Sequence, residues 1–431
     1  MCIICFLEDT TQSRMRKLAQ GRIDRFEGTL KTYKDDFLFK YKKSGCINDC
    51  SKHKDLPQKL KDWATELEKA LPDRNEIESY FDSIINVYVD WLSQRKNIDD
   101  KIEKIFEKTG FQKRKKEKLS ESLLFRARIS DKLLSKEDLY HIPFNKRYLV
   151  GNQRYSVSGI PMMYFGLSIP DVVSEMRGDY NDLSKYCFAG YFLKEKCKLN
   201  IFDFTNPFPS LFSSIKAITE YDGNVEWNQS GIVENEDYCI KAFYLFILYS
   251  CCSFNRRNRS EGNVFSEEYV LPQLVTKFIY NKGFDGIAFE STRVNDEVVY
   301  SKESFYQNTH KLNYVLFTKY NAEKNYDYDF LNKFYIAEPL KIDSCIEVTK
   351  TELETIKLEI RDISENKPWF DSIERLAQCS GISTENSFNK VFIKENDKEI
   401  QYWEHPMGKL HRYLLYSFLL TIRNKIQNNQ Y

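Results

Sequence analysis

The segment RYSVSGIPMMYFGLSIPDVVSEMR, residues 154–177, decides the fold because it predicts a strand followed directly by a helix. Its apolar middle, bounded by turn-forming residues, is typical of a short buried strand. Ser168 stands where a helix N-cap is expected, with Pro170 in the first turn and Asp171 three residues after the cap. Glu175 therefore falls on a capped helix that begins just after a strand.

Short apolar runs separated by turn signals continue on both sides of this segment. We predict strands at Leu123–Arg128, Ile287–Ser291 and Asn313–Phe317, a helix at Tyr269–Thr276 and a glycine turn at Gly283–Gly286. Strands mixed with helices in this way are typical of an α+β fold. We therefore expect a mixed sheet with packed helices over residues 121–348.

The two flanks of this central region have a different pattern. Apolar residues recur at helical spacing between charged ones in both flanks. Asp73 precedes one such run and is a good helix start, and the last helix, Leu410–Ile426, is apolar on one side. The sequence thus predicts a helical N-terminal domain (1–120), the α+β domain (121–348) and a helical C-terminal region (349–431).

The composition is that of a globular protein with substantial cores. The chain has 431 residues, of which 42% are hydrophobic and 15% aromatic, enough for two or three domains. Its formal net charge of +1 argues against bulk electrostatic binding of nucleic acid. The longest apolar run, Ala242–Phe254, is shorter than the about 20 residues that cross a bilayer. The first residues lack the basic start and cleavage site of a signal peptide, so we expect a cytoplasmic protein without membrane contact.

Four polar side chains stand at defined points of these elements. Arg126 lies in the first predicted strand, Arg154 precedes the second, Glu175 lies on the capped helix and Ser291 ends a later strand. Taken alone, each is more typical of an ordinary surface residue. Their order and surroundings, from Leu123 to Phe317, resemble those of the RES family, which is named for arginine, glutamate and serine positions.

The resemblance extends to the neighbouring motifs. Seven motifs follow one another in the order found in the family. They are the Phe-Arg-Ala-Arg strand, the Arg-Tyr turn, Gly-x-Pro, the strand with Tyr164, the Pro-Gln helix, the Gly-Phe-Asp-Gly-Ile turn and the Asn-x-Val-Leu-Phe strand. The chain departs from the family at Ser156, where asparagine is common. It also departs in a long later stretch whose Arg256, Arg257 and Arg259 have no counterpart.

The resemblance implies an ADP-ribosyltransferase-like fold and an enzyme that cleaves the bond between nicotinamide and ribose in NAD. Such cleavage builds positive charge on the ribose, which a carboxylate stabilises, and guanidinium groups suit the pyrophosphate. The resemblance assigns catalytic roles to Glu175, Arg126 and Ser291, which are expected to line one cleft. It assigns substrate-binding roles to Arg154 and Tyr164. NAD is the substrate, so catalysis needs no metal or redox cofactor.

The sequence leaves the acceptor of the ADP-ribose group open. Water or phosphate would make the protein an NAD glycohydrolase or phosphorylase. A macromolecular acceptor would make it an ADP-ribosyltransferase that modifies a protein or nucleic acid. Two alternatives come from other classes: a non-catalytic sensor of NAD or ADP-ribose, and a nucleic-acid-binding adaptor that uses the basic run 113–116 or the arginines near Arg257.

The helical flanks suggest control of the central domain. Helices on both sides of an NAD-cleaving domain suggest a toxin or phage-defence effector. Its control would come from a regulatory or antitoxin partner, from self-assembly or from a nucleic-acid trigger. The N-terminal helices resemble the HEPN-like domains that precede some RES domains. No arginine stands at the spacing before His53 that the HEPN ribonuclease motif requires, so an interaction or regulatory module is implied.

The N-terminal region also carries a candidate metal site. Cys2 and Cys5 form a Cys-x2-Cys pair, Cys46 and Cys50 form a Cys-x3-Cys pair, and His53 follows. Four thiolates suit tetrahedral zinc. Buried structural cysteines explain the pattern equally well, so zinc and a plain apolar environment are both open.

Overall fold

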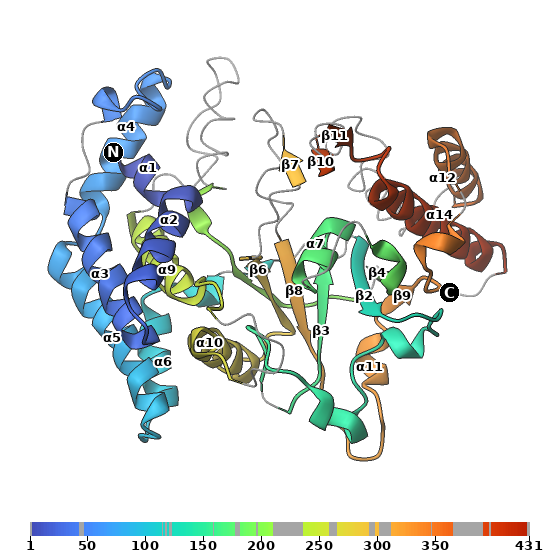
Figure 1. Ribbon diagram of the computed structural model, residues 1–431, viewed down its shortest axis with the longest axis horizontal. Helices are drawn as coiled ribbons and strands as arrows, with labels where there is room; N and C mark the ends of the chain where they lie inside the picture. The colour runs from blue at the N-terminus through green and yellow to red at the C-terminus, as the bar shows by residue number, and fades with distance from the viewer. Residues whose placement is uncertain are drawn as a thin grey trace. The chain divides into compact units, whose positions relative to one another are not determined.

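The computed structural model describes residues 2–42, 47–113, 115–116, 119, 123–157, 159–176, 182–194, 197–209, 236–257, 265–292, 298–300, 312–345, 347–364, 391–395 and 398–428 (Figure 1). The chain divides into two compact units, each made of segments from different parts of the sequence. Unit 1 contains Met1–Arg114, Gly151–Val157 and Phe204–Gly283. Unit 2 contains Lys115–Val150, Ser158–Asp203 and Phe284–Tyr431. A sheet with packed helices confirms the predicted α+β class.

The described part of unit 1 is helical. Its helices are α1 (Ile3–Leu7), α2 (Asp9–Arg22), α3 (Phe26–Lys42), α4 (Gln58–Ala70), α5 (Arg74–Leu92), α6 (Ile98–Glu107), α9 (Glu236–Cys252) and α10 (Val270–Asn281), with short 3₁₀ turns at η1 (Ile47–Asp49), η2 (Phe111–Lys113) and η8 (Glu267–Tyr269). Helix α5 begins where the sequence predicted. Asp73 accepts the backbone N–H of Glu76, and the Glu76 carboxylate accepts the N–H of Asp73. This capping box satisfies two N–H groups that a helix start otherwise leaves unpaired.

Aromatic side chains fill the core of unit 1. The ring centre of Phe37 in α3 lies 4.8 Å from that of Phe6 in α1 and 5.0 Å from that of Phe81 in α5. It also lies 6.3 Å from the ring centre of Phe246 in α9. These T-shaped and tilted arrangements are ones that aromatic pairs prefer. Four helices from distant parts of the sequence therefore meet at one ring.

Helix α9 contains most of the longest apolar run of the sequence. All its side chains from Ala242 to Cys252 are buried. The run thus serves as a central packing element of unit 1. Among the described residues, no helix is both long enough and apolar enough to span a membrane.

Unit 2 is built on an eight-stranded sheet with the strand order β1-β5-β6-β8-β3-β2-β4-β9. The strands are β1 (Lys115–Lys116), β2 (Leu123–Ile129), β3 (Met162–Gly166), β4 (Tyr186–Leu193), β5 (Ile201–Phe204), β6 (Gly286–Glu290), β8 (Leu312–Phe317) and β9 (Phe334–Ile336). Strands β2, β3, β6 and β8 confirm those predicted from apolar runs. A smaller sheet joins β7 (Val298–Tyr300), β10 (Val391–Glu395) and β11 (Lys398–Gln401).

Helices and short turns complete unit 2. They are α7 (Ile169–Glu175), α11 (Tyr328–Leu331), α12 (Lys350–Ser364), α14 (Pro406–Gln427), η4 (Glu137–Leu139), η5 (Phe144–Leu149), η6 (Leu183–Lys185) and η10 (Ile342–Ser344). Figure 1 shows α12 and α14 side by side. The apolar side of the C-terminal helix, recognised in the sequence, is the side that α14 buries.

Strand alternation gives the large sheet two buried faces. On one face, which we call the α14 face, Phe125 of β2 and Phe192 of β4 pack with α12 and α14. The ring centres of Phe192 and Phe418 are 5.4 Å apart there. On the other face, which we call the Leu139 face, Tyr191 packs in a cluster with Leu139. Two consecutive residues of a strand therefore point to opposite faces of the sheet and pack against different helices or turns.

Candidate functional site

Helix α7 carries Glu175 and lies close against the sheet. Ser168 is its N-cap: the Ser168 hydroxyl accepts the backbone N–H of Asp171 and donates to the Asp171 carboxylate at 2.6 Å, which confirms the predicted cap. Gly166 of β3 permits the close approach of the helix. A Cβ added at Gly166 would lie 2.9 Å from Cβ of Asp171 and 2.9 Å from Cγ2 of Val172. The cap and the glycine together fix the path of α7, which ends at Glu175.

Glu175 accepts two hydrogen bonds on one carboxylate oxygen. Ser291 Oγ and Asn313 Nδ2 each donate to Glu175 Oε2 at 3.2 Å. Ser291 directly follows β6, and Asn313 lies on the adjacent strand β8. Ser291 and Asn313 are buried, whereas Glu175 is half-buried. The structure therefore brings together two of the predicted residues, Glu175 and Ser291, and holds the carboxylate in one orientation. We call these three residues the Glu175 group.

Asn313 is the member of the Glu175 group that sequence reasoning did not select. The residue is 1% exposed. Within the described part of the chain, its Oδ1 atom is buried without a hydrogen-bond partner. Such atoms are rare in proteins because an unsatisfied buried polar atom costs free energy. A signal was present in the sequence, since an asparagine inside an otherwise apolar strand needs polar partners.

Strand pairing places Tyr164 on the same face of the sheet as Asn313. Across β3 and β8, Gly166 lies opposite Asn313 and Tyr164 lies opposite Val315. Directly opposed residues of an antiparallel pair point to the same face, and Tyr164 is thus a diagonal neighbour of Asn313. The predicted substrate-binding tyrosine therefore shares a face with the Glu175 group.

Arg126 lies on the other face of the sheet. Phe125 of β2 pairs with Gly166 of β3, so Phe125 points to the face that carries Asn313. Successive residues of a strand point in opposite directions, and Arg126 consequently points to the Leu139 face. This corrects the expectation that Arg126 lines one cleft with Glu175 and Ser291. The physical reason is the period of two along a strand, which the position of the motif alone does not reveal.

The Arg126 guanidinium is held by three backbone carbonyls. Its Nε donates to the carbonyl of Leu139 at 2.9 Å. Its Nη1 and Nη2 donate to the carbonyls of Tyr164 and Tyr140 at 3.2 and 3.4 Å. Burial, together with the positive charge of Arg128, lowers the pKa of Arg126 to about 10, so it stays charged at neutral pH. These contacts tie β3 to the segment that contains Leu139.

Arg154 belongs to unit 1, where it caps the C-terminal end of α9. Its Nη1 and Nη2 donate to the carbonyls of Cys252 and Phe254, both at 2.7 Å. Its guanidinium carbon also lies 5.0 Å from the ring centre of Tyr269. A cation is favourable at a helix C-terminus because carbonyl groups there lack helical partners. These contacts give Arg154 a structural task, and its binding of NAD stays a prediction.

The arginines of the long stretch are partly accounted for inside unit 1. The Arg257 guanidinium donates to the carbonyl of Asp24 and the hydroxyl of Thr29. Arg259 lies outside the described residues. In the basic run, Lys115–Lys116 forms the short strand β1, which pairs with β5.

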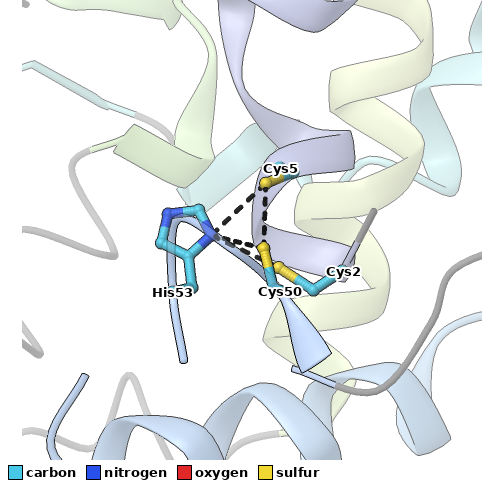
Figure 2. Close-up of side chains that lie close together, drawn as sticks. All are labelled: Cys2, Cys5, Cys50 and His53. Atoms are coloured by element: carbon cyan, nitrogen blue, oxygen red, sulfur yellow. Dashed lines mark hydrogen bonds between the residues drawn. The ribbon is translucent and has the colours of Figure 1, made fainter. Parts of the chain in front are cut away.

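A cysteine–histidine cluster forms in unit 1, and Figure 2 shows its four side chains pointing toward one another. His53 Nδ1 lies 3.3 Å from the Sγ atoms of Cys2 and Cys5 and 3.6 Å from that of Cys50. The Sγ atoms of Cys5 and Cys50 are 3.6 Å apart. All four ligand atoms lie within 4.8 Å of one another. The cluster can therefore hold a metal ion.

His53 completes this cluster, whereas the predicted fourth ligand was Cys46, which lies outside the described residues. The tight turn after η1 explains why Cys50 and His53 meet. The backbone N–H groups of His53 and Lys54 both donate to the Cys50 carbonyl, at 3.1 and 2.8 Å. Such a turn brings residues three apart to the same side of the chain.

Burial controls the thiols of the cluster. It raises the pKa of Cys2, and it raises the pKa of Cys5 to about 12. Burial acts the same way on Cys50, but hydrogen bonds from the Lys52 backbone and from the other two thiols lower the pKa of Cys50 to about 6. A bound metal ion requires thiolates, so binding would release protons from this group.

Comparison with known proteins gives one similarity. Over 181 residues the chain is 26% identical to the protein named “Putative toxin YopC” of Bacillus subtilis (strain 168). The matched region is 41% of this chain and 37% of that protein, so the chain covers little more than a third of its relative. No family model and no solved structure matches the chain. The similarity associates part of the chain with a toxin-like protein and leaves its chemistry open.

Proposed function

We propose that the protein is an NAD-cleaving toxin of the RES type and that Glu175 is its main catalytic residue. The observation that carries this proposal is the pair of hydrogen bonds from Ser291 and Asn313 to one Glu175 oxygen. A carboxylate held in a fixed orientation before the reaction is suited to stabilise a developing cation. The RES-like order of motifs from Leu123 to Phe317 supports NAD as the substrate.

The proposed reaction breaks the bond between the anomeric carbon of the nicotinamide ribose and the pyridinium nitrogen. The bonding electrons pass to that nitrogen, nicotinamide leaves as a neutral molecule, and positive charge builds on the ribose. Glu175 stabilises this charge. Water attacks the same carbon and loses a proton, which yields ADP-ribose; phosphate as the acceptor yields ADP-ribose phosphate. NAD is consumed as a substrate, and no resident cofactor is assigned to this step.

The neighbours of Glu175 have supporting roles in this proposal. Ser291 and Asn313 orient the carboxylate through their hydrogen bonds to Oε2. Tyr164 lies on the face of Asn313 and stacks on the nicotinamide ring. Arg126 acts from the other face, because its bond to the Tyr164 carbonyl fixes the backbone of β3.

The toxin role rests on the similarity to YopC and on the chemistry of NAD loss. An enzyme that drains NAD acts on the cytoplasmic pool and must be restrained in its own cell. We therefore infer a regulatory or antitoxin partner, or activation by self-assembly or a nucleic acid. Transfer of ADP-ribose to a protein or nucleic acid is the second candidate, since it uses the same oxocarbenium chemistry with a different acceptor.

The two non-catalytic alternatives make different predictions. A sensor would bind NAD or ADP-ribose without turnover. A nucleic-acid-binding adaptor would show strong salt dependence of binding. The internal hydrogen bonds of Arg257 favour the enzyme over the adaptor, because this guanidinium already has partners within unit 1.

Incubation of the purified protein with NAD, with and without phosphate, tests the proposal. We expect free nicotinamide together with ADP-ribose or its phosphate, identified by mass. A Glu404→Gln variant, which changes an exposed glutamate of unit 2, serves as the matched control for Glu175→Gln. Intact NAD after prolonged incubation with folded protein, alone and with cell extract as the source of a trigger or acceptor, would reject the enzyme.

A further inference from the structure

We propose that Cys2, Cys5, Cys50 and His53 bind one zinc ion at a closed structural site. The proposal concerns unit 1 and is independent of NAD cleavage. It differs from the sequence-based expectation in its ligand set, because one imidazole nitrogen takes the place of a fourth sulfur.

The separations in the cluster are close to the edges of a tetrahedron around zinc. With Zn–S bonds of about 2.3 Å and Zn–N bonds of about 2.05 Å, a regular tetrahedron has S–S edges of about 3.8 Å and S–N edges of about 3.6 Å. The observed S–N distances are 3.3, 3.3 and 3.6 Å, and the Cys5–Cys50 sulfur distance is 3.6 Å. The two sulfur pairs that include Cys2 lie within 4.8 Å, so shifts of at most about 1 Å would complete the coordination.

The chemistry of the ligands selects the metal. Three thiolates and one imidazole form a soft donor set that suits zinc and excludes magnesium and calcium, which require oxygen ligands. The three cysteines are buried and His53 is half-buried. With all four positions supplied by the protein, no site for water or substrate remains, as in structural zinc sites.

A second layer of side chains orients the histidine. His53 Nε2 lies 3.5 Å from Glu8 Oε1, and Glu8 Oε2 lies 3.3 Å from Lys52 Nζ. The Nδ1 atom of His53 faces the sulfurs, so with Nδ1 bound to zinc the proton would lie on Nε2 and point toward the carboxylate. This carboxylate–histidine arrangement commonly accompanies metal-bound histidine, because it fixes the tautomer and raises ligand basicity.

The site would anchor α1 in the core of unit 1. Helix α1 has five residues, too few for an isolated helix to be stable. Its Phe6 and Leu7 are nevertheless fully buried. A zinc ion would link α1 to the turn after η1 across 45 to 51 residues of sequence, which reduces the conformational freedom of the unfolded chain.

Metal analysis and cobalt substitution of the full chain test the site. Protein purified without added chelator is expected to contain about one zinc ion per chain, with X-ray absorption showing three sulfurs and one nitrogen. The cobalt-substituted protein should show thiolate charge-transfer bands and the intense visible bands of tetrahedral cobalt. Folded protein that fails to bind added zinc or cobalt, or that binds it through oxygen ligands, would overturn the proposal.

Paired variants identify the ligands. His53→Ala should lose the ion, whereas Cys46→Ser and Cys197→Ser, which remove thiols that do not belong to the proposed ligand set, should keep it. The reverse result for His53 and Cys46 would replace the proposed set with four cysteines. If His53→Ala does not fold, Glu8→Gln decides: it keeps all ligands and should weaken zinc affinity about 10–100-fold in a chelator competition. A zinc affinity of Glu8→Gln equal to that of a Glu66→Gln control would contradict the proposal that Glu8 orients His53.

Discussion

Ser291 Oγ lies 3.2 Å from Glu175 Oε2, although 116 positions of sequence separate the two residues. One residue ends a helix and the other follows a strand. Asn313, on the neighbouring strand, donates to the same oxygen. Three segments that are far apart in the sequence thus meet at one carboxylate.

Replacing Glu175 with glutamine should lower the rate of NAD cleavage far more than it lowers NAD binding. The substitution keeps the shape and removes the charge, and the cation that this charge stabilises exists mainly in the transition state. Loss of one such stabiliser costs about 100–1000-fold in rate. Turnover measured by mass spectrometry, with NAD binding measured by calorimetry, checks the prediction. A folded Glu175→Gln protein that cleaves NAD at the parent rate would remove Glu175 from the mechanism.

Ser291→Ala and Asn313→Ala should each lower activity, and the double variant should lose less than the product of the two single effects. Both side chains donate to the same oxygen, and residues that share a partner are coupled energetically. A double-mutant cycle on kcat and KM measures this coupling. Strictly multiplicative effects on both constants would mean that the two residues act independently.

Arg126→Ala should destabilise unit 2 without a direct effect on NAD affinity. The change leaves the carbonyls of Leu139, Tyr140 and Tyr164 without their shared donor, at a cost of about 2–5 kcal/mol. Arg126→Lys should recover only part of the lost stability, because an ammonium group lacks the planar set of N–H donors of a guanidinium group. Urea unfolding gives the stability, and calorimetry on folded protein gives the affinity. Normal stability with strongly weakened NAD binding would restore a direct role for Arg126.

The protein should lose stability as the pH falls below about 6.5, in part through His141. Burial lowers the pKa of His141, and Arg126 and Arg128 act in the same direction, against the hydrogen bond to the Ile142 carbonyl and the charge of Asp327. His141 Nε2 accepts the backbone N–H of Asp327 at 2.8 Å, which requires the neutral ring. The unfolded chain takes up the proton near its usual pKa of about 6.5 while the folded chain does not.

Stability should therefore decrease by at most about 1.4 kcal/mol per pH unit for this one group as the pH falls below about 6.5. Urea unfolding of the parent and of His141→Gln at several pH values measures the effect. The variant should be less stable at neutral pH but less sensitive to acid. Parallel pH profiles for the two proteins would show that His141 does not contribute.

Gly166→Ala should move α7 and reduce activity, whereas Gly151→Ala should have little effect. The added methyl group at Gly166 would meet Asp171 and Val172 at 2.9 Å, whereas nothing lies within 4 Å of one at Gly151. Overpacking of this kind costs about 1–3 kcal/mol. Thermal unfolding and NAD turnover of the two variants provide the comparison. Equal behaviour of both variants would show that α7 tolerates displacement.

Local patterns predicted the elements of this fold well. The Ser168 cap, the start of α5 at Asp73 and four strands of the large sheet follow from neighbouring residues alone. Each of these features is decided within a few positions, by hydrogen bonds to nearby N–H groups or by apolar alternation. The position of Glu175 at the end of α7 is likewise decided by neighbouring residues.

Features that depend on pairing could not be predicted in this way. The face on which Arg126 lies depends on the register of β2 against β3, and no residue of the motif encodes that register by itself. Asn313 gains its partner from a helix far away in the sequence. His53 joins three cysteines because of a local turn and the packing of α1, so a count of thiols favoured Cys46 instead.

Unit 1 has a consequence for the order of events during synthesis. It includes Phe204–Gly283 as well as the first 114 residues. Phe37 therefore cannot contact Phe246 until about 200 further residues have been synthesised. At roughly 5–20 residues per second, the delay is on the order of ten seconds. During that time α3 and α5 lack the part of their packing that α9 supplies. A chain that stops before Ser291 and Asn313 cannot assemble the Glu175 group, because two of its three members have not yet been synthesised.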